Sequence, residues 1–320
     1  MDQNKAEIAK DFPPFFRVHK NGLIDRYIHT DFIPPSQHPQ TLVQSKDVII
    51  SQQNKLSARI YLPKSAVSNN HTRKFPLLIY IHGGAFSVQS PFSSIYHTYL
   101  NNLVSESEVI AVSVDYRLAP ENPLPACYDD AWSVFNWVFS HSGKKIQDFP
   151  GPGKPEKPEP WMSDHVDYTR VFLAGDSAGA NIAHDLLVRA SSKNLKLEGM
   201  ILIHPFFGNG KKADKLWEYI YPGTSGVHDP RLNPAAHVNL LKKLSCKRIM
   251  ICVAEEDELR KRGWYYYESV KRSGWNGEVE IVETKGESHV FHLLDPCCEN
   301  AGIFMKQVAS FINKIGFSAL

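Results

Sequence analysis

The sequence is poor in the features that mark membrane, nucleic-acid-binding and disulfide-rich proteins. Its five cysteines are odd in number and form no Cys-x-x-Cys pair, so we expect free thiols in a reducing compartment. The charges of the 36 basic and 34 acidic residues nearly cancel, so the sequence lacks the excess of positive charge that favours nucleic-acid binding. No apolar run reaches the roughly 18 to 20 residues of a membrane helix. The 14 histidines form no tight cluster with cysteines, which gives no argument for a metal.

The start of the chain, from Met1 to Glu7, is polar and charged and does not resemble a secretory signal. Together with the cysteine usage, this predicts a cytoplasmic protein. The length of 320 residues would allow two domains, but α/β enzymes of this size often form one, so we expect a single domain over 1–320. We expect a small-molecule substrate, no cofactor, and neither nucleic acid nor membrane as a partner. Nothing in the sequence predicts the oligomeric state.

Short apolar runs alternate with amphipathic segments of helical length along most of the chain. The expected strands are 48–51, 56–63, 77–81, 109–117, 171–174, 199–207, 248–254 and 279–283. The expected helices include 98–106, 127–141, 259–273 and 300–315. Repeated strand-then-helix units predict a mostly parallel central sheet flanked by helices. In such sheets, functional residues collect at the carboxyl ends of the strands.

Two segments do not fit this alternation. Residues 1–45 are aromatic and broken by prolines, and Asn21-Gly22 within them is typical of a hairpin turn. They either add strands to the edge of the main sheet or form part of a cap over the active site, because exposed aromatic side chains must pack somewhere. Residues 208–234, rich in glycine, proline and aromatic residues, are the second candidate for a cap.

The aromatic residues of these segments suggest an apolar, aromatic pocket. They are Trp217, Tyr219, Tyr221 and the N-terminal phenylalanines. Two further segments are expected to be loops: the polar stretch 65–74 and the proline-rich stretch 150–160, whose role the sequence does not reveal.

One stretch combines a strand, a sharp turn and a helix around a single serine. The strand expected at 171–174 leads into Gly175-Asp-Ser-Ala-Gly179, and a helix-compatible run follows. This is the G-x-S-x-G nucleophile elbow in the context it requires. The turn would hold Ser177 in a strained conformation with its hydroxyl above the sheet, and the two glycines would let strand and helix approach closely. The amide of Ala178, at the helix start, would point toward a developing oxyanion.

A second element upstream strengthens this interpretation, since G-x-S-x-G alone also occurs in ordinary strand-to-helix turns. An apolar strand runs directly into His82-Gly-Gly-Ala85, an HGGG-type loop. Such a loop offers backbone N–H groups to the same oxyanion. The two elements in this order are far more specific than either alone.

A serine hydroxyl needs a base to take its proton, and the base needs a partner to orient it. Chains with this elbow carry the acid and then the histidine downstream of the serine. The acid candidates at a strand end are Glu255, Glu256, Asp257 and Glu258. Two histidines follow. His289 comes after a short strand and a glycine turn, whereas His292 lies in an apolar run, where a packed or surface histidine is the preferred interpretation.

Other polar residues near strand ends have simpler interpretations. Asp115 and Arg117 indicate a buried ion pair or strand-end network. Asp176 is expected to fix the elbow by hydrogen bonds, and His184 to pack against its neighbours. His204 could touch the pocket.

Several of these motifs, taken together, resemble those of a known protein family. His82-Gly-Gly-Ala85, Asp115–Pro125 and Gly175–His184 resemble the plant carboxylesterase family, which belongs to the hormone-sensitive-lipase-like branch of the α/β-hydrolases. The segments Cys252–Asp257 and Gly286–Leu293 are similar to the family's acid and histidine segments, so the resemblance covers almost the whole chain. It implies an α/β-hydrolase fold, to which the N-terminal segment and residues 208–234 would add a cap.

The resemblance also selects among the candidates. It implies a triad of Ser177, Asp257 and His289, and an oxyanion hole formed by Gly83, Gly84 and Ala178. Ala85 replaces the third glycine of the family's HGGG pattern. We expect this departure to matter little if the first two glycines supply the amides, but to alter the acyl pocket.

Three functions are compatible with this pattern. The first is a serine carboxylesterase that hydrolyses a small apolar or aromatic ester through an acyl-enzyme. The second is a biosynthetic dehydratase, cyclase or ester-cleaving decarboxylase of isoflavonoid or alkaloid metabolism, because relatives of the family eliminate or cyclise. The third is a non-catalytic hormone receptor; the related gibberellin receptors have lost the catalytic histidine, whereas His289 is present here, so this function ranks last.

Overall fold

The computed structural model describes residues 7–68, 73–143 and 158–314. The larger part of the proline-rich segment expected as a loop, residues 150–157, lies outside the described residues. Its last residue begins helix α4 (Pro160–His165). Of the polar loop expected at 65–74, residues 65–68 belong instead to a short helix, α1 (Lys64–Ser68), and residues 69–72 lie outside the described residues.

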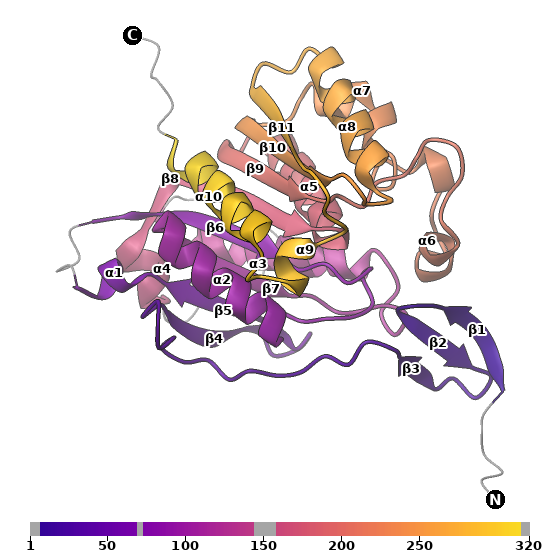
Figure 1. The fold of residues 1–320 in the computed structure, drawn as a ribbon, viewed down its shortest axis with the longest axis horizontal. Coiled ribbons are helices and arrows are strands. Elements are labelled where there is room, and N and C mark those ends of the chain that lie inside the picture. The colour runs from indigo at the N-terminus through magenta and orange to yellow at the C-terminus, as the bar shows by residue number, and fades with distance from the viewer. Residues whose placement is uncertain (1–6, 69–72, 144–157, 315–320) are drawn as a thin grey trace, which may run out of the picture.

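The described residues include an eight-stranded sheet, which is parallel over most of its width (Figure 1). Its strands, in order across the sheet, are β11 (Glu278–Thr284), β10 (Cys246–Ala254), β9 (Leu197–Ile203), β8 (Val166–Asp176), β6 (Phe75–Ile81), β7 (Ile110–Asp115), β5 (Leu56–Leu62) and β4 (Gln44–Ser51). The pairs from β11 to β7 are parallel, and β5 and β4 complete one edge in antiparallel pairing. The predicted mostly parallel sheet is confirmed.

Helices cover both faces of this sheet (Figure 1). One face carries α2 (Ser94–Ser107), α9 (Phe291–Leu294) and α10 (Glu299–Asn313), and the other carries α3 (Ala126–Ser140), α5 (Ala178–Ser192) and α8 (Arg260–Arg272). Strand β6 is buried at all seven positions. Its side chains alternate between the two cores: Leu77 and Ile79 join the core under α5, while Leu78 and Tyr80 join the core under α2. Burial on both faces explains why the strand reads as a continuous apolar run.

The N-terminal segment forms a separate antiparallel sheet of three strands, β1 (Ile8–Phe12), β2 (Phe16–His19) and β3 (Ile24–Arg26). The predicted hairpin at Asn21-Gly22 is confirmed, whereas the alternative that this segment extends the edge of the main sheet is wrong. The small sheet packs against helix α6 (Lys215–Ile220), where the ring centroids of Phe12 and Tyr219 lie 4.8 Å apart. Two segments distant in sequence therefore meet beside the carboxyl ends of the main strands (Figure 1).

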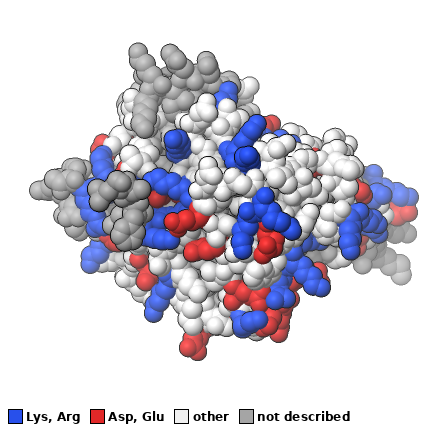
Figure 2. Space-filling model, turned by 90° about the horizontal axis from the view of Figure 1, so that it is seen from above, with Lys and Arg blue, Asp and Glu red and all other residues white. Residues whose placement is uncertain are grey.

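Residues 221–245 contain only short elements. They are the 3₁₀ turns η1 (Gly226–His228) and η2 (Pro234–Ala236) and helix α7 (Val238–Leu241). All five cysteines are free thiols, as predicted. No helix in the described ranges has both the length and the apolar character needed to cross a bilayer. The cytoplasmic location stays a prediction. Basic and acidic side chains are interspersed over the face shown in Figure 2.

Candidate active site

Ser177 occupies the turn between β8 and α5 in a strained conformation. Its φ of 51° and ψ of −116° lie in a backbone region that residues other than glycine rarely adopt. Its amide donates to the carbonyl of Ile203 at 2.8 Å, and its carbonyl accepts from the amide of Phe206 at 3.0 Å. Ile203 is the last residue of β9 and Phe206 lies in the loop that follows it, so the neighbouring strand and its exit hold the turn in place. The strain predicted from the sequence is therefore present in the backbone.

Gly179 allows helix α5 to begin directly against strand β6. A Cβ atom at this position would lie 2.0 Å from the carbonyl oxygen of Ile81 and 2.5 Å from that of His82. A Cβ at Gly175 would lie 2.5 Å from the carbonyl of Gly179. These contacts are too short for any side chain, because the obstacles are backbone atoms. Both glycines of the elbow are thus required by the close approach of strand and helix, as the motif predicts.

Asp176 precedes the serine and is almost fully buried. One carboxylate oxygen accepts from the Tyr80 hydroxyl at 2.9 Å and from the Gly83 amide at 3.1 Å. The other accepts from the Tyr96 hydroxyl at 2.9 Å. Burial raises the pKa of Asp176 to about 6 despite these donors. The carboxylate joins the elbow to the loop that follows β6, which is the hydrogen-bonding role that the sequence indicates.

The amide of Gly83 is already used inside the protein. It donates to Asp176 and, at 2.8 Å, to the hydroxyl oxygen of Tyr96. The predicted role of this amide in an oxyanion hole is therefore contradicted, because the N–H cannot also point into the cavity. The amides of Gly84 and Ala85 make no hydrogen bond to another described residue, and Ala85 lines the cavity beside the serine.

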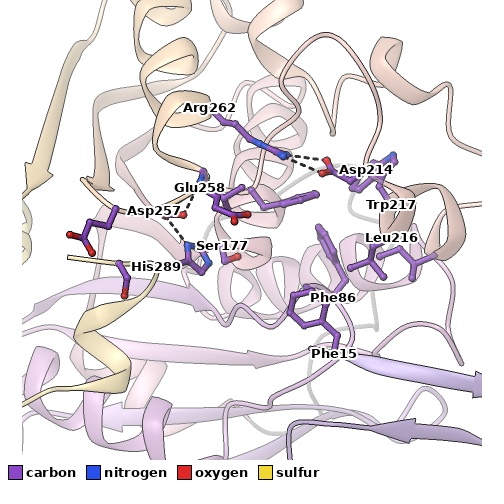
Figure 3. Close-up of a pocket in the computed structure, with 16 residues that line it drawn as sticks. Phe15, Phe86, Ser177, Asp214, Leu216, Trp217, Asp257, Glu258, Arg262 and His289 are labelled. Carbon is purple, nitrogen blue, oxygen red and sulfur yellow. Dashed lines mark hydrogen bonds and ion pairs between the residues drawn. The ribbon is translucent and has the colours of Figure 1, made fainter. Parts of the chain in front are cut away.

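Asp257, the acid after strand β10, contacts His289 farther along the chain. Nδ1 of His289 lies 2.8 Å from Oδ2 of Asp257, and Oδ1 of Asp257 accepts from the amide of Leu259 at 2.8 Å. Burial raises the pKa of Asp257, but the hydrogen bond and charge of His289 outweigh it and hold that pKa below its usual value. Ser177, Asp257 and His289 all line one cavity, and Figure 3 shows them at its end.

The competing candidates lie elsewhere. Glu255 pairs with Lys285 at 2.9 Å, and Glu256 and Glu258 are exposed at the cavity mouth. His292 is buried against Phe304, with ring centroids 4.8 Å apart. The arrangement therefore brings together the acid and the histidine that the family resemblance selects.

Three other sequence expectations have mixed outcomes. Arg117 pairs with Asp130 at 2.8 Å, while Asp115 accepts from Ser57 at 2.7 Å, so a strand-end network forms without an ion pair between Asp115 and Arg117. His184 packs between aromatic rings, as expected. His204 does not line the cavity; its ring lies behind that of His289, at 5.7 Å between centroids.

The cavity has a volume of about 390 Å³, and its wall is mostly apolar. Its apolar lining consists of Phe15, Ala85, Phe86, Phe206, Leu216, Trp217, Ile220 and Leu259. The small N-terminal sheet and α6 both contribute, so both predicted cap segments border the site. Of the aromatic residues expected there, Trp217 and Phe15 line the cavity, whereas Tyr219 packs against the small sheet.

Charged residues line the cavity on the side of β10 and α8. Arg262 makes a bidentate ion pair with Asp214, at 3.0 and 3.1 Å (Figure 3). Glu256 and Glu258 have no ion-pair partner among the described residues. The two unpaired carboxylates therefore give the mouth of the cavity a local negative charge.

Sequence reasoning missed several lining residues. Phe86 and Phe206 each come shortly after a strand end, so the rule that sites form at carboxyl ends of strands could have found them. The pair of Arg262 and Asp214 joins segments 48 residues apart and had no sequence signal.

Comparisons with known proteins agree with this geometry. Residues 78–293 match the family described as "alpha/beta hydrolase fold", and residues 30–120 match the "Carboxylesterase family". "Probable carboxylesterase 1" of Arabidopsis thaliana is 41% identical, over 98% of this chain and 99% of its own. The chain belongs to the plant carboxylesterase family of the α/β-hydrolases. It is accordingly a carboxylic ester hydrolase, as the sequence predicted.

Two further relatives bear on the reaction and the fold. A protein of Glycyrrhiza echinata named "2-hydroxyisoflavanone dehydratase" is 39% identical over 96% of both chains. The solved structure of a Pyrobaculum calidifontis esterase matches with a TM-score of 0.66 and 24% identity, over 84% of both chains. The match to this solved structure shows the α/β-hydrolase fold.

Proposed function

We propose that this plant carboxylesterase cleaves small, apolar or aromatic carboxylic esters by acyl transfer to Ser177. The observation that carries the proposal is the meeting of three groups at one cavity end. The strained elbow holds the serine, and His289 is oriented by a 2.8 Å hydrogen bond to Asp257. His289 would accept the proton of the serine as it attacks the ester carbonyl, and would then donate it to the leaving alcohol.

The developing oxyanion would be bound by backbone amides. The amides of Gly84 and Ala85 are not used by other described residues, and Ala178 is the first residue of α5, where an amide has no acceptor within the helix. We therefore assign the oxyanion hole to Gly84, Ala85 and Ala178, so that Ala85 takes the place predicted for Gly83. Removing one such donor typically costs about 100- to 1000-fold in rate. Water then releases the acyl group.

The lining supports an uncharged substrate. The wall is mostly apolar and includes the aromatic side chains of Phe86 and Phe206, which favours apolar or aromatic acyl and alcohol groups. The exposed carboxylates of Glu256 and Glu258 at the mouth would repel an anionic ester.

The decisive experiment is hydrolysis of p-nitrophenyl acetate and butyrate by wild type and Ser177→Ala. We expect the variant to lose at least about 10⁴-fold in kcat, since the nucleophile is removed. Ser192→Ala is the matched control, because this exposed serine lies at the far end of the same helix and donates to the carbonyl of Arg189. Equal turnover by wild type and Ser177→Ala would refute the mechanism.

A second candidate is elimination of water from a hydroxy ketone, favoured by the relative named "2-hydroxyisoflavanone dehydratase". His289 would then take a proton from the carbon beside a carbonyl, and the same amides would stabilise the enolate. The measurement is isoflavone formation from a 2-hydroxyisoflavanone. Formation that persists in Ser177→Ala would favour this reaction over hydrolysis.

A further inference from the structure

The loop that carries His289 depends on an unusual backbone conformation. Val290, the next residue, has a φ of 51°, in the left-handed region that β-branched residues avoid. Its amide donates to Nδ1 of His204 at 2.9 Å. Since backbone strain persists only where the surroundings enforce it, this hydrogen bond identifies the group that holds the turn.

His204 is itself firmly fixed to the sheet. It follows β9, its exposure is 1%, and its amide donates to the carbonyl of Cys252 on β10 at 2.9 Å. Its ring lies within 6.4 Å, between centroids, of the rings of four residues. These are His289, Phe291, His292 and Phe304. The histidine thus connects the rigid sheet to the catalytic loop.

The hydrogen bond also fixes the protonation of the ring. A backbone N–H can donate only to an atom with a free lone pair, so Nδ1 of His204 must be unprotonated. The proton of the neutral ring therefore resides on Nε2. Burial lowers the pKa of His204 well below its usual value, and the nearby His292 and His289 act in the same direction, against Asp257. The ring therefore stays neutral and keeps its acceptor while the adjacent His289 gains and loses its proton.

We propose that His204 is a positioning residue for the reaction: by accepting the Val290 amide it sets the turn that aims His289 at Ser177. This inference rests on the proposed function, because it concerns the aim of the general base. His204 does not line the cavity, so its removal would act on the chemical step and not on substrate binding.

The test compares two amide replacements. In His204→Asn, the side-chain oxygen can occupy the place of Nδ1 and accept the Val290 amide. In His204→Gln, the polar group lies one bond further out, near the place of Nε2, although glutamine is closer to histidine in volume. A role in packing alone would thus favour the glutamine variant, whereas the positioning role favours asparagine.

We expect kcat of His204→Gln for p-nitrophenyl acetate to fall about 10- to 100-fold, the size of effect caused by misplacing a catalytic group by about 1 Å. The KM should change less than about twofold, and His204→Asn should keep kcat within about threefold of wild type. Thermal unfolding of both variants ensures that activity is measured on folded protein. Equal losses in the two variants, or wild-type kcat in His204→Gln, would overturn the proposal.

A second measurement does not depend on turnover. Amide hydrogen exchange of the segment 286–293 should be accelerated about tenfold or more at Val290 in His204→Gln and should remain slow in His204→Asn. Exchange that is the same in all three proteins would overturn the inference. Absence of turnover by wild type, or turnover that survives Ser177→Ala, would instead count against the proposed function. In that case the exchange measurement alone would decide the role of His204.

Discussion

At the carboxyl end of the main sheet, the reacting groups are held by hydrogen bonds from buried backbone and hydroxyl groups. In the cap beside them, the small N-terminal sheet and helix α6 meet through contacts between side chains. Asp176 accepts three bonds, from two tyrosine hydroxyls and a backbone amide, and Asp257 accepts two, from a backbone amide and the imidazole of His289, all from 2.8 to 3.1 Å. In the cap, Phe12 and Tyr219 join the small sheet to α6 through ring contact. Hydrogen bonds weaken steeply when misaligned, whereas ring contacts tolerate a wider range of angles, so the first region suits chemistry and the second suits a variable substrate.

A surface ion pair also joins the cap to the loop region. Arg26 of β3 donates to the carbonyl of Ser87 at 2.7 Å and pairs with Glu121 at 2.6 Å. Both Arg26 and Glu121 are partly exposed, so this pair contributes little stability. The comparison predicts large, substrate-independent losses from changes at the strand ends and smaller, substrate-dependent losses from changes in the cap.

The largest of the remaining effects is expected for Asp257→Asn. The amide cannot stabilise the imidazolium of His289 and favours the wrong tautomer, so kcat should fall about 10³- to 10⁴-fold for acetate and butyrate esters alike. Glu256→Gln is the matched control, since this neighbouring carboxylate does not contact His289, and it should lose less than about threefold. Similar losses in both variants would show that charge, and not the specific hydrogen bond, matters.

The next effect concerns stability and pH. The pKa of Asp176 is raised from 3.8 to about 6, so the folded protein binds a proton more tightly than the unfolded chain. Its contribution to stability is present below pH about 4 and is lost as pH rises through about 6, by roughly 3 kcal/mol. Urea unfolding of Asp176→Asn should lack this decrease relative to wild type. Asp115, also raised to about 6, keeps its own decrease of the same sign. Identical pH profiles for the variant and wild type would contradict the assignment.

The smallest effect is expected in the cap. Phe15→Ala removes an apolar wall of the cavity, so kcat/KM should fall about 10-fold for p-nitrophenyl hexanoate and less than about twofold for acetate, which is too short to reach it. Phe32→Ala is the control, because this phenylalanine is 62% exposed and does not line the cavity. A uniform loss for both esters would indicate that the cap positions the triad as well.

Much of the site could be predicted because its geometry is local. The elbow requires glycine at Gly175 and Gly179 and strain at Ser177, and these demands lie within five consecutive residues. The choice of Asp257 over its acidic neighbours was different. Spacing left four candidates open, and only the family resemblance separated them before the structure placed one carboxylate against His289.

What failed to follow from the sequence involves contacts between distant segments. The assignment of Gly83 to the oxyanion hole overlooked its competition with Asp176, whose carboxylate takes that amide from 93 positions away. The alternative that residues 1–45 extend the main sheet failed because β1, β2 and β3 satisfy one another's hydrogen bonds and place Phe16 against Tyr219 of α6 instead.

The sequence alone determined the parallel sheet and the strained elbow that carries Ser177, because apolar periodicity and glycine requirements act over neighbouring residues. The tertiary structure decided which amides remain free for an oxyanion, which aromatic side chains reach the cavity and how the Val290 turn is held. These depend on His204, Asp176 and the small N-terminal sheet meeting partners far away in the chain, and such meetings follow from packing in three dimensions.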